Sequence, residues 1–438
     1  MSESGGEYAT EPVPDQKTLP WFRVGFVAAM VAFSLPTFVT GIEVAAAVDG
    51  RSALLAILAG NLLLTVIGSF CGSIGSRTRL SSYMLARIAF GTRGAALVNT
   101  AFAVSLLGWF GVNIDLFSGA VLRLSSDVIG RSPPVWAVEI VAGLVMTTTT
   151  IYGFRAINWL SSLLVPVLMV VTILLINRAL GLQSFGETFA AGSGAGGELS
   201  FGDAMSAVVG AVIIGAIILP DITRFIREWR GAVYTAVMSY LVIGSLVQVA
   251  GALAATAFDN SDLLDVMIVI GLSWAAFAIV ITGSWILNSL NLYSTVLSIE
   301  ATFPSLPNRP LIIVLGVLGT VAAFFDILET FLTFLFYLAV IFAPVAGVIA
   351  IDYLFLRRSV YHEARLTAEQ DYFPAAIAAW VLGAIIAVLA SEGMLSITGI
   401  AALDAIGVTA GSFLLLHRLI GSKKERAAEM DSVPRSKP

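Results

Sequence analysis

The sequence has one cysteine and two histidines, and charged residues make up only 12% of its 438 positions. A single cysteine, Cys71, excludes an internal disulfide and any metal site built from several cysteines. Soluble domains carry roughly twice this charged fraction, so the composition argues against an ordinary soluble protein. The net charge of −5 says little about partners, because few charges lie outside the loops.

Long apolar runs, in contrast, are abundant. Hydrophobic residues account for 58% of the chain, and the mean hydropathy is +0.92. Each run, as a helix, can cross a bilayer core of about 30 Å. The sequence therefore predicts an all-α polytopic membrane protein with about twelve spans: Phe22–Ala47, Ser52–Phe70, Gly94–Leu122, Pro134–Tyr152, Asn158–Ile176, Phe201–Phe225, Ala232–Ala257, Leu272–Thr295, Pro310–Phe325, Leu328–Leu356, Phe373–Leu389 and Ile397–Leu416.

The polar segments predict the orientation of the chain. With a cytoplasmic N-terminus, every Lys and Arg falls in a cytoplasmic segment except Arg51, Arg123, Arg131 and Arg178. Positive charge collects on the cytoplasmic side, so we expect an even number of spans and both termini in the cytoplasm. Residues 1–21 lack an apolar core preceded by basic residues, which indicates a disordered tail rather than a cleavable signal. Leu80–Phe90 and Ser261–Val269 are expected to lie at the membrane surface.

Two predicted spans carry helix breakers at the depth of the bilayer. Pro36 interrupts the first span, and Gly210, Gly215 and Pro220 interrupt the sixth. Proline removes a backbone donor and glycine tolerates unwinding, and exposed backbone at this depth is tolerated only around a cavity. Although Pro and Gly are common in membrane helices, a matched pair of interrupted helices predicts a secondary transporter built on inverted repeats.

The third predicted span contains the motif Gly108-Trp109-Phe110-Gly111. An indole between glycines is a flat surface with space in front of it, which suits a planar solute, so we expect Trp109 to form the floor of a binding site. Asn113 lies about 40° from Trp109 on the helix and predicts a hydrogen bond either to the solute or to another helix. Asp115 lies about 120° away and predicts an outer gate or a packing contact, paired with Arg51 or Arg123.

Several short motifs occur along the chain in a fixed order: Gly60-Asn61-Leu62-Leu63-Leu64, Leu85-Ala86-Arg87-Ile88-Ala89-Phe90-Gly91, Gly108-Trp109-Phe110-Gly111, Asp221-Ile222-Thr223-Arg224-Phe225 and Ile351-Asp352-Tyr353. From about Pro12 to the last span, the sequence resembles the nucleobase:cation symporter-1 family, nearest its cytosine and purine–cytosine permease branch. The resemblance implies a leucine-transporter-like core of five plus five helices with two accessory helices. It also implies import of planar heterocycles by alternating access, with Trp109 stacked on the solute.

This architecture divides the chain into expected units. A cytoplasmic tail (1–21) precedes the first repeat (22–177), an extracellular loop (178–200) and the second repeat (201–358). Two accessory spans (359–417) and a basic cytoplasmic tail (418–438) follow.

The sequence departs from the cytosine permease pattern where polar contacts to the base are expected. The departures are Leu106 for a glutamine, Ala211, Val212 and Ile214 in a segment that usually supplies serines and a phenylalanine, and Ile286 and Leu287 for the adjacent hydroxyl residues of a sodium site. A buried polar group without a partner costs about 1–3 kcal/mol. Either other groups contact the base, or the solute is not cytosine.

Other polar residues are candidates to replace these contacts. Ser284, Asn288, Asn291 and Thr295 share one helical stripe, and Asn288, near the membrane centre, predicts either a solute contact or an interhelical hydrogen bond. Phe38 is expected to close over the solute opposite Trp109. The expected solute-binding residues are Thr37, Phe38, Leu106, Trp109, Asn113, Gly210, Gly215 and Asn288.

A second group of residues is expected to serve coupling and gating: Thr40, Glu43, Asp115, Asp221, Arg224 and Asn291. An intramembrane carboxylate such as Glu43 usually faces a cavity or a partner; it predicts a proton carrier or a counter-charge for a cationic solute, unless it lies near the hydrated outer surface. Asp221 and Arg224, three residues apart, predict an ion pair or a gate at the cytoplasmic end of the sixth span.

The sequence thus predicts a permease of the cell membrane that imports a nucleobase-like heterocycle, with the proton favoured over sodium as the coupling ion. A transporter of the same fold for an amine, an amino acid or a zwitterion neutralised by Glu43 is the alternative. A membrane enzyme or sensor is disfavoured, since the sequence offers no clustered catalytic constellation, and broken helices suit occlusion better than a channel. We expect no cofactor, no nucleic-acid partner, and a monomer or weak oligomer in the bilayer.

Overall fold

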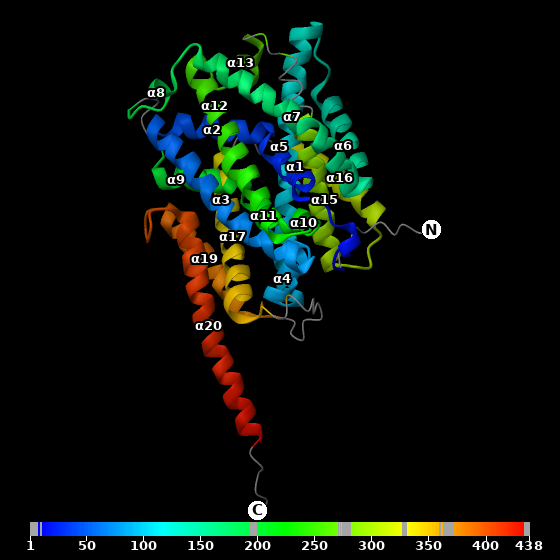
Figure 1. The fold of residues 1–438 in the computed structure, drawn as a ribbon, viewed down its shortest axis with the longest axis vertical. Helices are drawn as coiled ribbons and strands as arrows, with labels where there is room; N and C mark the ends of the chain where they lie inside the picture. Colours follow the sequence, from blue (N-terminus) through cyan, green and yellow to red (C-terminus); the bar gives the residue numbers. More distant parts are fainter. Residues whose placement is uncertain are drawn as a thin grey trace, which may run out of the picture.

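The computed structural model describes residues 8, 11–192, 199–269, 271, 273, 282–325, 331–358, 361 and 372–432. Described there are the helices α1 (Trp21–Ala32), α2 (Leu35–Ala47), α3 (Gly50–Thr78), α4 (Ser82–Phe90), α5 (Thr92–Ile129), α6 (Val135–Ile151), α7 (Gly153–Leu180), α8 (Phe185–Thr188), α9 (Phe201–Ile217), α10 (Pro220–Thr223), α11 (Trp229–Ala236), η2 (Val237–Gly244), α12 (Ser245–Phe258), α13 (Leu263–Val269), α15 (Ser284–Thr302), α16 (Asn308–Ala322), α17 (Phe331–Ile351), η6 (Asp352–Leu356), α19 (Pro374–Ser391) and α20 (Ala401–Ser432). The helices form one elongated bundle, from one end of which α20 projects (Figure 1).

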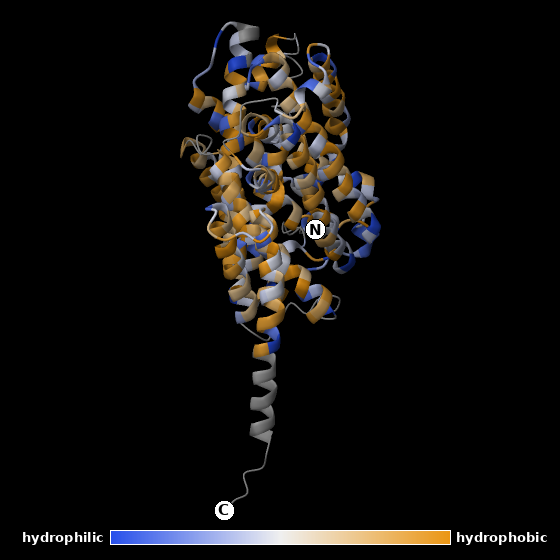
Figure 2. Ribbon diagram, turned by 90° about the vertical axis from the view of Figure 1, so that its left-hand side faces the viewer, coloured by the Kyte–Doolittle hydropathy of each residue, from blue (hydrophilic) through white to orange (hydrophobic). Residues whose placement is uncertain are grey.

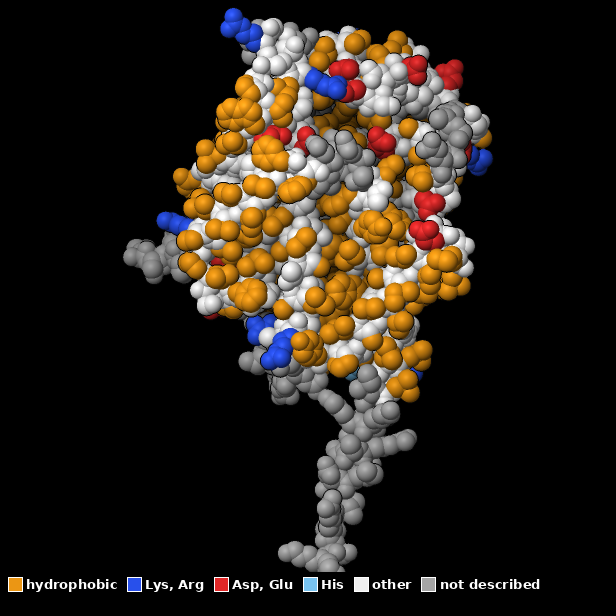
Figure 3. Space-filling model, turned by 180° about the vertical axis from the view of Figure 1, so that it is seen from behind, with side chains coloured by type: hydrophobic (Ala, Val, Ile, Leu, Met, Phe, Trp, Pro, Cys, Tyr) orange, Lys and Arg blue, Asp and Glu red, His pale blue; other side chains and the backbone are white. Residues whose placement is uncertain are grey.

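The surface of the bundle is that of a membrane protein. Apolar residues colour most of its length (Figure 2) and cover the visible face (Figure 3). Among the described residues, nine helical segments are long and apolar enough to cross a membrane, or ten if the bent pair α1–α2 counts as one span. α6 is shorter than the others, and the start of the eighth predicted span lies mostly outside the described residues. The predicted total of twelve spans therefore stays a prediction.

The predicted break in the first span is confirmed. α1 and α2 meet at an angle of 49°, and the break falls at Phe33 and Ser34. Pro36 lies in the first turn of α2, where its missing N–H group leaves no helical hydrogen bond unmade. Thr37 and Thr40 consequently lie in regular helix and not in an unwound segment.

The sixth span is interrupted beside Pro220, as expected, but not at Gly210 and Gly215. α9 continues through Gly210 and Gly215 and ends at Ile217, and α10 begins at Pro220. Unwinding at Gly210–Gly215 was therefore a wrong prediction. A Cβ at Gly210 would lie 1.9 Å from the carbonyl oxygen of Leu335 in α17, so this glycine permits close packing of two helices.

Residues 11–20 pack against the bundle, which differs from the disordered tail expected for residues 1–21. Val13 is buried, and its N–H donates to the carbonyl of Arg79 (3.1 Å). The N–H of Leu19 donates to the carbonyl of Phe225 (2.7 Å), and that of Arg227 donates to Leu19 (3.2 Å). We call residues 11–20 the N-terminal strap. It covers the segment that follows the break in the sixth span.

Two further segments differ from expectation. α4, predicted to lie at the membrane surface, is not open to its surroundings: it buries almost every residue against α5, α15, α17 and α19. α20 continues as helix to Ser432, through most of the segment expected to be a tail.

Candidate functional site

A cavity lies between the broken spans and three other elements. Its volume is about 60 Å³. The cavity is therefore narrow. It is lined by Ala28, Val31, Ser34, Pro36, Thr37 and Thr40 of the first span, Leu106 and Trp109 of α5, Ala211, Val212, Ile214, Gly215, Ile218, Leu219 and Ile222 of the sixth span, Tyr240 of η2, and Leu287, Leu290, Asn291 and Ser294 of α15.

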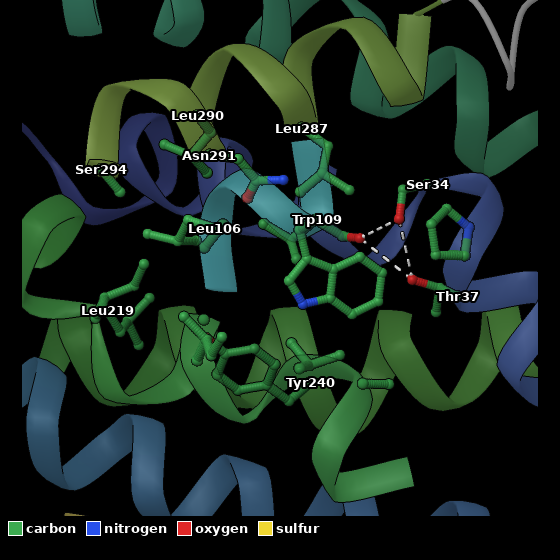
Figure 4. Close-up of a pocket in the computed structure, with 18 of the residues that line it drawn as sticks. Ser34, Thr37, Leu106, Trp109, Leu219, Tyr240, Leu287, Leu290, Asn291 and Ser294 are labelled. Carbon is green, nitrogen blue, oxygen red and sulfur yellow. Dashed lines mark hydrogen bonds between the residues drawn. The ribbon is translucent and has the colours of Figure 1, made fainter. Parts of the chain in front are cut away.

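Trp109 is central in this cavity (Figure 4). Its indole is only 7% exposed and makes edge-to-face contacts with Phe334 (ring centroids 5.3 Å apart) and Phe331 (6.1 Å) of α17. Such pairs hold an aromatic ring in one orientation. Gly111 permits close packing of two helices: a Cβ there would lie 2.8 Å from the backbone of Ala322, so this glycine brings α5 against α16.

Hydroxyl groups compensate the break in the first span. Ser34 Oγ donates to the carbonyl of Val31 (2.8 Å), and Thr37 Oγ1 approaches the same carbonyl at 3.3 Å. The two hydroxyls also lie 3.2 Å apart (Figure 4). The carbonyl that the broken helix leaves unpaired thus acquires side-chain donors. Thr40 Oγ1 donates to the carbonyl of Pro36 (2.8 Å).

The polar stripe of α15 faces the cavity through Asn291. Asn288 is buried behind it, and its Nδ2 donates to the carbonyl of Phe110 in α5 (2.9 Å). Asn291 Nδ2 in turn donates to Asn288 Oδ1 (3.3 Å). Asn288, expected to contact the solute, therefore anchors α15 to α5 and positions Asn291, which was expected to serve coupling.

Other residues of the expected site do not line the cavity either. Asn113 is buried and its Nδ2 donates to the carbonyl of Trp109 (2.7 Å). Phe38 is fully buried and is absent from the lining. Gly210 packs on α17, as described above. Glu43 is half-buried in α2 and is absent from the lining.

The expected gating residues Asp221 and Arg224 are buried where the sixth span ends. Asp221 Oδ1 accepts from the N–H of Ser82 (2.8 Å). Arg224 donates to the carbonyl of Tyr8 (2.7 Å) and to the hydroxyl of Tyr293 (3.2 Å). These contacts connect the sixth span to α4, to α15 and to the start of the chain, and they lie next to Ile222 at the edge of the cavity.

On the other side of the bundle, the structure changes the partner expected for Arg123. Its guanidinium pairs with Asp262 and, at 3.2 Å, with Asp265 of α13. Asp115 is half-buried in α5 and does not line the cavity. The ion pairs fasten α13 to the end of α5.

The positions expected to hold sodium offer no side-chain oxygen. Ile286 is buried and Leu287 lines the cavity, and neither side chain is a ligand for a hard cation. The residues present do not fit the hydroxyl pair of the resemblance.

Sequence reasoning missed several residues of the site. Ser34 lies at the break between α1 and α2, two residues before Pro36, so it could have been predicted from that proline. Tyr240 gave no signal, because a tyrosine in an apolar run has no periodic polar pattern. The apolar wall of Ile218, Leu219 and Ile222 was hidden for the same reason.

The architecture and the cavity invite comparison with known proteins. The sequence model of permeases for cytosine/purines, uracil, thiamine and allantoin matches residues 13–411. The chain belongs to this permease family. The cytosine permease of Escherichia coli (strain K12) is 30% identical over 424 residues, which cover 96% of each protein. The hydantoin permease of Microbacterium maritypicum is 23% identical over 362 residues, 77% of this chain and 73% of that protein.

Solved structures agree with this permease fold. The nucleobase-cation-symport-1 transporter Mhp1, closed with bromovinylhydantoin bound, superposes with a TM-score of 0.79 at 19% identity over 96% of each chain. A Na⁺-coupled sialic acid symporter in a substrate-bound outward-open state gives a TM-score of 0.70 at 13% identity, over 95% of this chain and 92% of that one. The protein is a transporter and not an enzyme, as the sequence predicts.

Proposed function

We propose that this permease imports a neutral, flat heterocycle of the nucleobase or hydantoin type by alternating access. The observation that supports this most strongly is Trp109 in a narrow cavity whose described lining contains no charged side chain. A charged solute there would leave water without an opposite charge, which is costly. A neutral heterocycle is therefore favoured over an amine or a zwitterion.

The apolar walls of the cavity narrow the class of solute further. Leu106, Ala211 and Ile214 face the cavity and cannot hydrogen-bond to an amino group or carbonyl. Related permeases carry the names cytosine permease and hydantoin permease, and Mhp1 was captured with bromovinylhydantoin. We propose a heterocycle with an apolar substituent as a better solute than cytosine.

Uptake by the purified protein in proteoliposomes tests the solute class. Labelled cytosine, uracil, hydantoin and 5-benzylhydantoin are compared, with small amines and amino acids as competitors. We expect saturable uptake of a heterocycle, best for 5-benzylhydantoin, and no competition by amines. Uptake that amines abolish and that no heterocycle affects would overturn the proposal.

For coupling, we propose the proton, since Ile286 and Leu287 cannot ligate sodium. Glu43 and Asp221 are the candidate carriers: the first is an intramembrane carboxylate, and the second follows the break of the sixth span. Uptake is measured under a proton gradient and under a sodium gradient, each applied alone. Loss of proton-driven uptake in Glu43→Gln or in Asp221→Asn would identify the carrier, whereas uptake driven by sodium alone would refute proton coupling.

The proposed topology places both termini in the cytoplasm and treats the two broken spans as equivalent members of five-helix repeats. Protease access to a C-terminal tag tests the first part. We expect cleavage in inverted vesicles and protection in intact spheroplasts.

A further inference from the structure

One side chain of the cavity comes from an unusual stretch of backbone. Tyr240 lies in η2, an eight-residue π-helix between α11 and α12. π-helical turns are rare and frequently occur at functional sites. The wider turn rotates the side chains that follow it relative to a continuous α-helix. In this span, the π-helix brings Tyr240 to the cavity.

Two glycines make room for the tyrosine. A Cβ at Gly68 of α3 would lie 2.5 Å from Cε2 of Tyr240, so even alanine there would displace the ring. A Cβ at Gly215 of α9 would lie 4.0 Å from the Tyr240 hydroxyl. Because Gly215 itself lines the cavity, the hydroxyl is the end of the side chain that lies at the cavity.

The hydroxyl of Tyr240 is available to a ligand. The side chain is only 4% exposed, yet its hydroxyl has no hydrogen-bond partner among the described residues. Buried polar groups normally have one. The hydroxyl of Tyr240 is not among the fully enclosed polar atoms that lack a partner, so at the cavity it is open to a partner that enters.

Asn291 offers a complementary group. Its amide nitrogen donates to Asn288, which turns the amide oxygen of Asn291 into the acceptor available to the cavity. Figure 4 shows Asn291 and Tyr240 on different sides of the indole of Trp109. All three residues line the same cavity, so a ring stacked on Trp109 can meet both the acceptor of Asn291 and the hydroxyl of Tyr240.

We propose that Tyr240 determines which heterocycles this permease accepts. Its hydroxyl donates a hydrogen bond to a carbonyl oxygen of the stacked ring, while Asn291 Oδ1 accepts from a ring N–H. The ligand class is thus a cyclic amide or imide with an N–H and a carbonyl on the ring. This inference rests on the proposed function, because it assumes that a heterocycle occupies the cavity.

The test compares the binding of oxygen and thio ligands by the unaltered protein and by two Tyr→Phe variants. Binding to the full-length protein in lipid nanodiscs is measured for uracil, hydantoin, 5-benzylhydantoin and the 2-thio and 4-thio forms of hydantoin, in which sulfur, a weak acceptor, replaces one carbonyl oxygen. Tyr240→Phe removes the hydroxyl and keeps the ring. Tyr234→Phe is the matched control, since Tyr234 belongs to the same span and is 52% exposed.

We expect Tyr240→Phe to weaken the oxygen ligands about three- to tenfold, the usual value of one neutral hydrogen bond, and to leave one of the two thio forms unchanged. Tyr234→Phe binds every ligand like the unaltered protein. Equal binding of the oxygen ligands by Tyr240→Phe and the unaltered protein would overturn the role of Tyr240 while leaving the heterocycle transporter standing. If the unaltered protein binds no ligand of the panel, the proposed function itself fails, and this inference with it.

Discussion

The two broken spans of this permease solve the same problem with different chemistry. At the break between α1 and α2, the carbonyl of Val31 receives the hydroxyls of Ser34 and Thr37. At the break between α9 and α10, the N–H of Ile218 donates to Ile214 (2.8 Å), that of Asp221 donates to Ile218 (2.9 Å), and Thr223 Oγ1 donates to the carbonyl of Leu219 (3.1 Å). Both breaks thus have side-chain donors, but the hydroxyls of the first line the cavity and that of the second does not.

This difference shapes the cavity. The first span contributes hydroxyl groups to the lining, whereas the sixth contributes alanine, glycine and branched aliphatic residues. The sixth span is therefore an apolar wall, and the polar contacts come from the first span, Tyr240 and α15. The asymmetry explains how a member of this family can lack polar groups in its sixth span and keep a broken helix there.

The largest effect on ligand affinity is expected at Trp109, which lies in the cavity between the two broken spans. Trp109→Ala removes the stacking surface and lowers affinity for the transported heterocycle about ten- to hundredfold, since stacking of a base on an aromatic side chain contributes about 1–3 kcal/mol. Equilibrium binding in detergent measures it. Trp159→Ala is the control, because Trp159 is 65% exposed on α7. Unchanged binding by Trp109→Ala would contradict the stacking role.

Substitution of the two glycines of the sixth span, Gly210 and Gly215, is expected to change stability to different extents. Gly210→Ala forces a Cβ against the carbonyl of Leu335 in α17 and is expected to cost about 1–3 kcal/mol, as overpacking does. At Gly215 a Cβ would make only ordinary contacts, the nearest at 3.4 Å, so Gly215→Ala keeps the melting temperature. Thermal melting followed by circular dichroism compares them. Equal melting temperatures of both variants and the unaltered protein would show that α9 and α17 can move apart to accept the added Cβ without loss of stability.

The hydroxyls at the first break predict non-additive losses. Ser34→Ala or Thr37→Val alone leaves the carbonyl of Val31 one donor and costs less than about 1 kcal/mol. The double variant leaves the carbonyl without a side-chain donor and costs more than the sum of the two. Chemical or thermal unfolding of the four proteins measures the difference. Strict additivity would mean that the two hydroxyls do not substitute for each other.

The smallest effect concerns the N-terminal strap beneath the sixth-span break. Asp15 pairs with Arg79 at 3.3 Å, but its side chain is 85% exposed, so Asp15→Asn is expected to change stability by less than about 1 kcal/mol, less still at high salt. Arg79 also donates to the carbonyl of Arg227 (3.1 Å), so Arg79→Ala costs more. A larger loss in Asp15→Asn than in Arg79→Ala would contradict this ranking.

The sequence was sufficient to predict the membrane class, a break close to Pro36 and a place for Trp109 in the cavity lining, because each has a local physical cause. It could not separate Asn288 from Asn291, since the rotation of α15 about its axis depends on its neighbours. Gly210 and Gly215 were expected to have the same role for a similar reason: a glycine in a helix signals either close packing or unwinding. η2 and the N-terminal strap depend on backbone hydrogen bonds, for which residue patterns carry no signal.

Cys71, the sole cysteine of the chain, is buried in α3, one turn from the glycine that accommodates Tyr240. A thiol-reactive fluorophore reaches it only when the bundle opens, so its labelling rate is a built-in reporter of unfolding. Replacing this one residue also gives a background free of thiols. In that cysteine-free protein, pairs of new cysteines labelled on either side of the cavity would report the opening and closing of the transporter through the distance between the two labels.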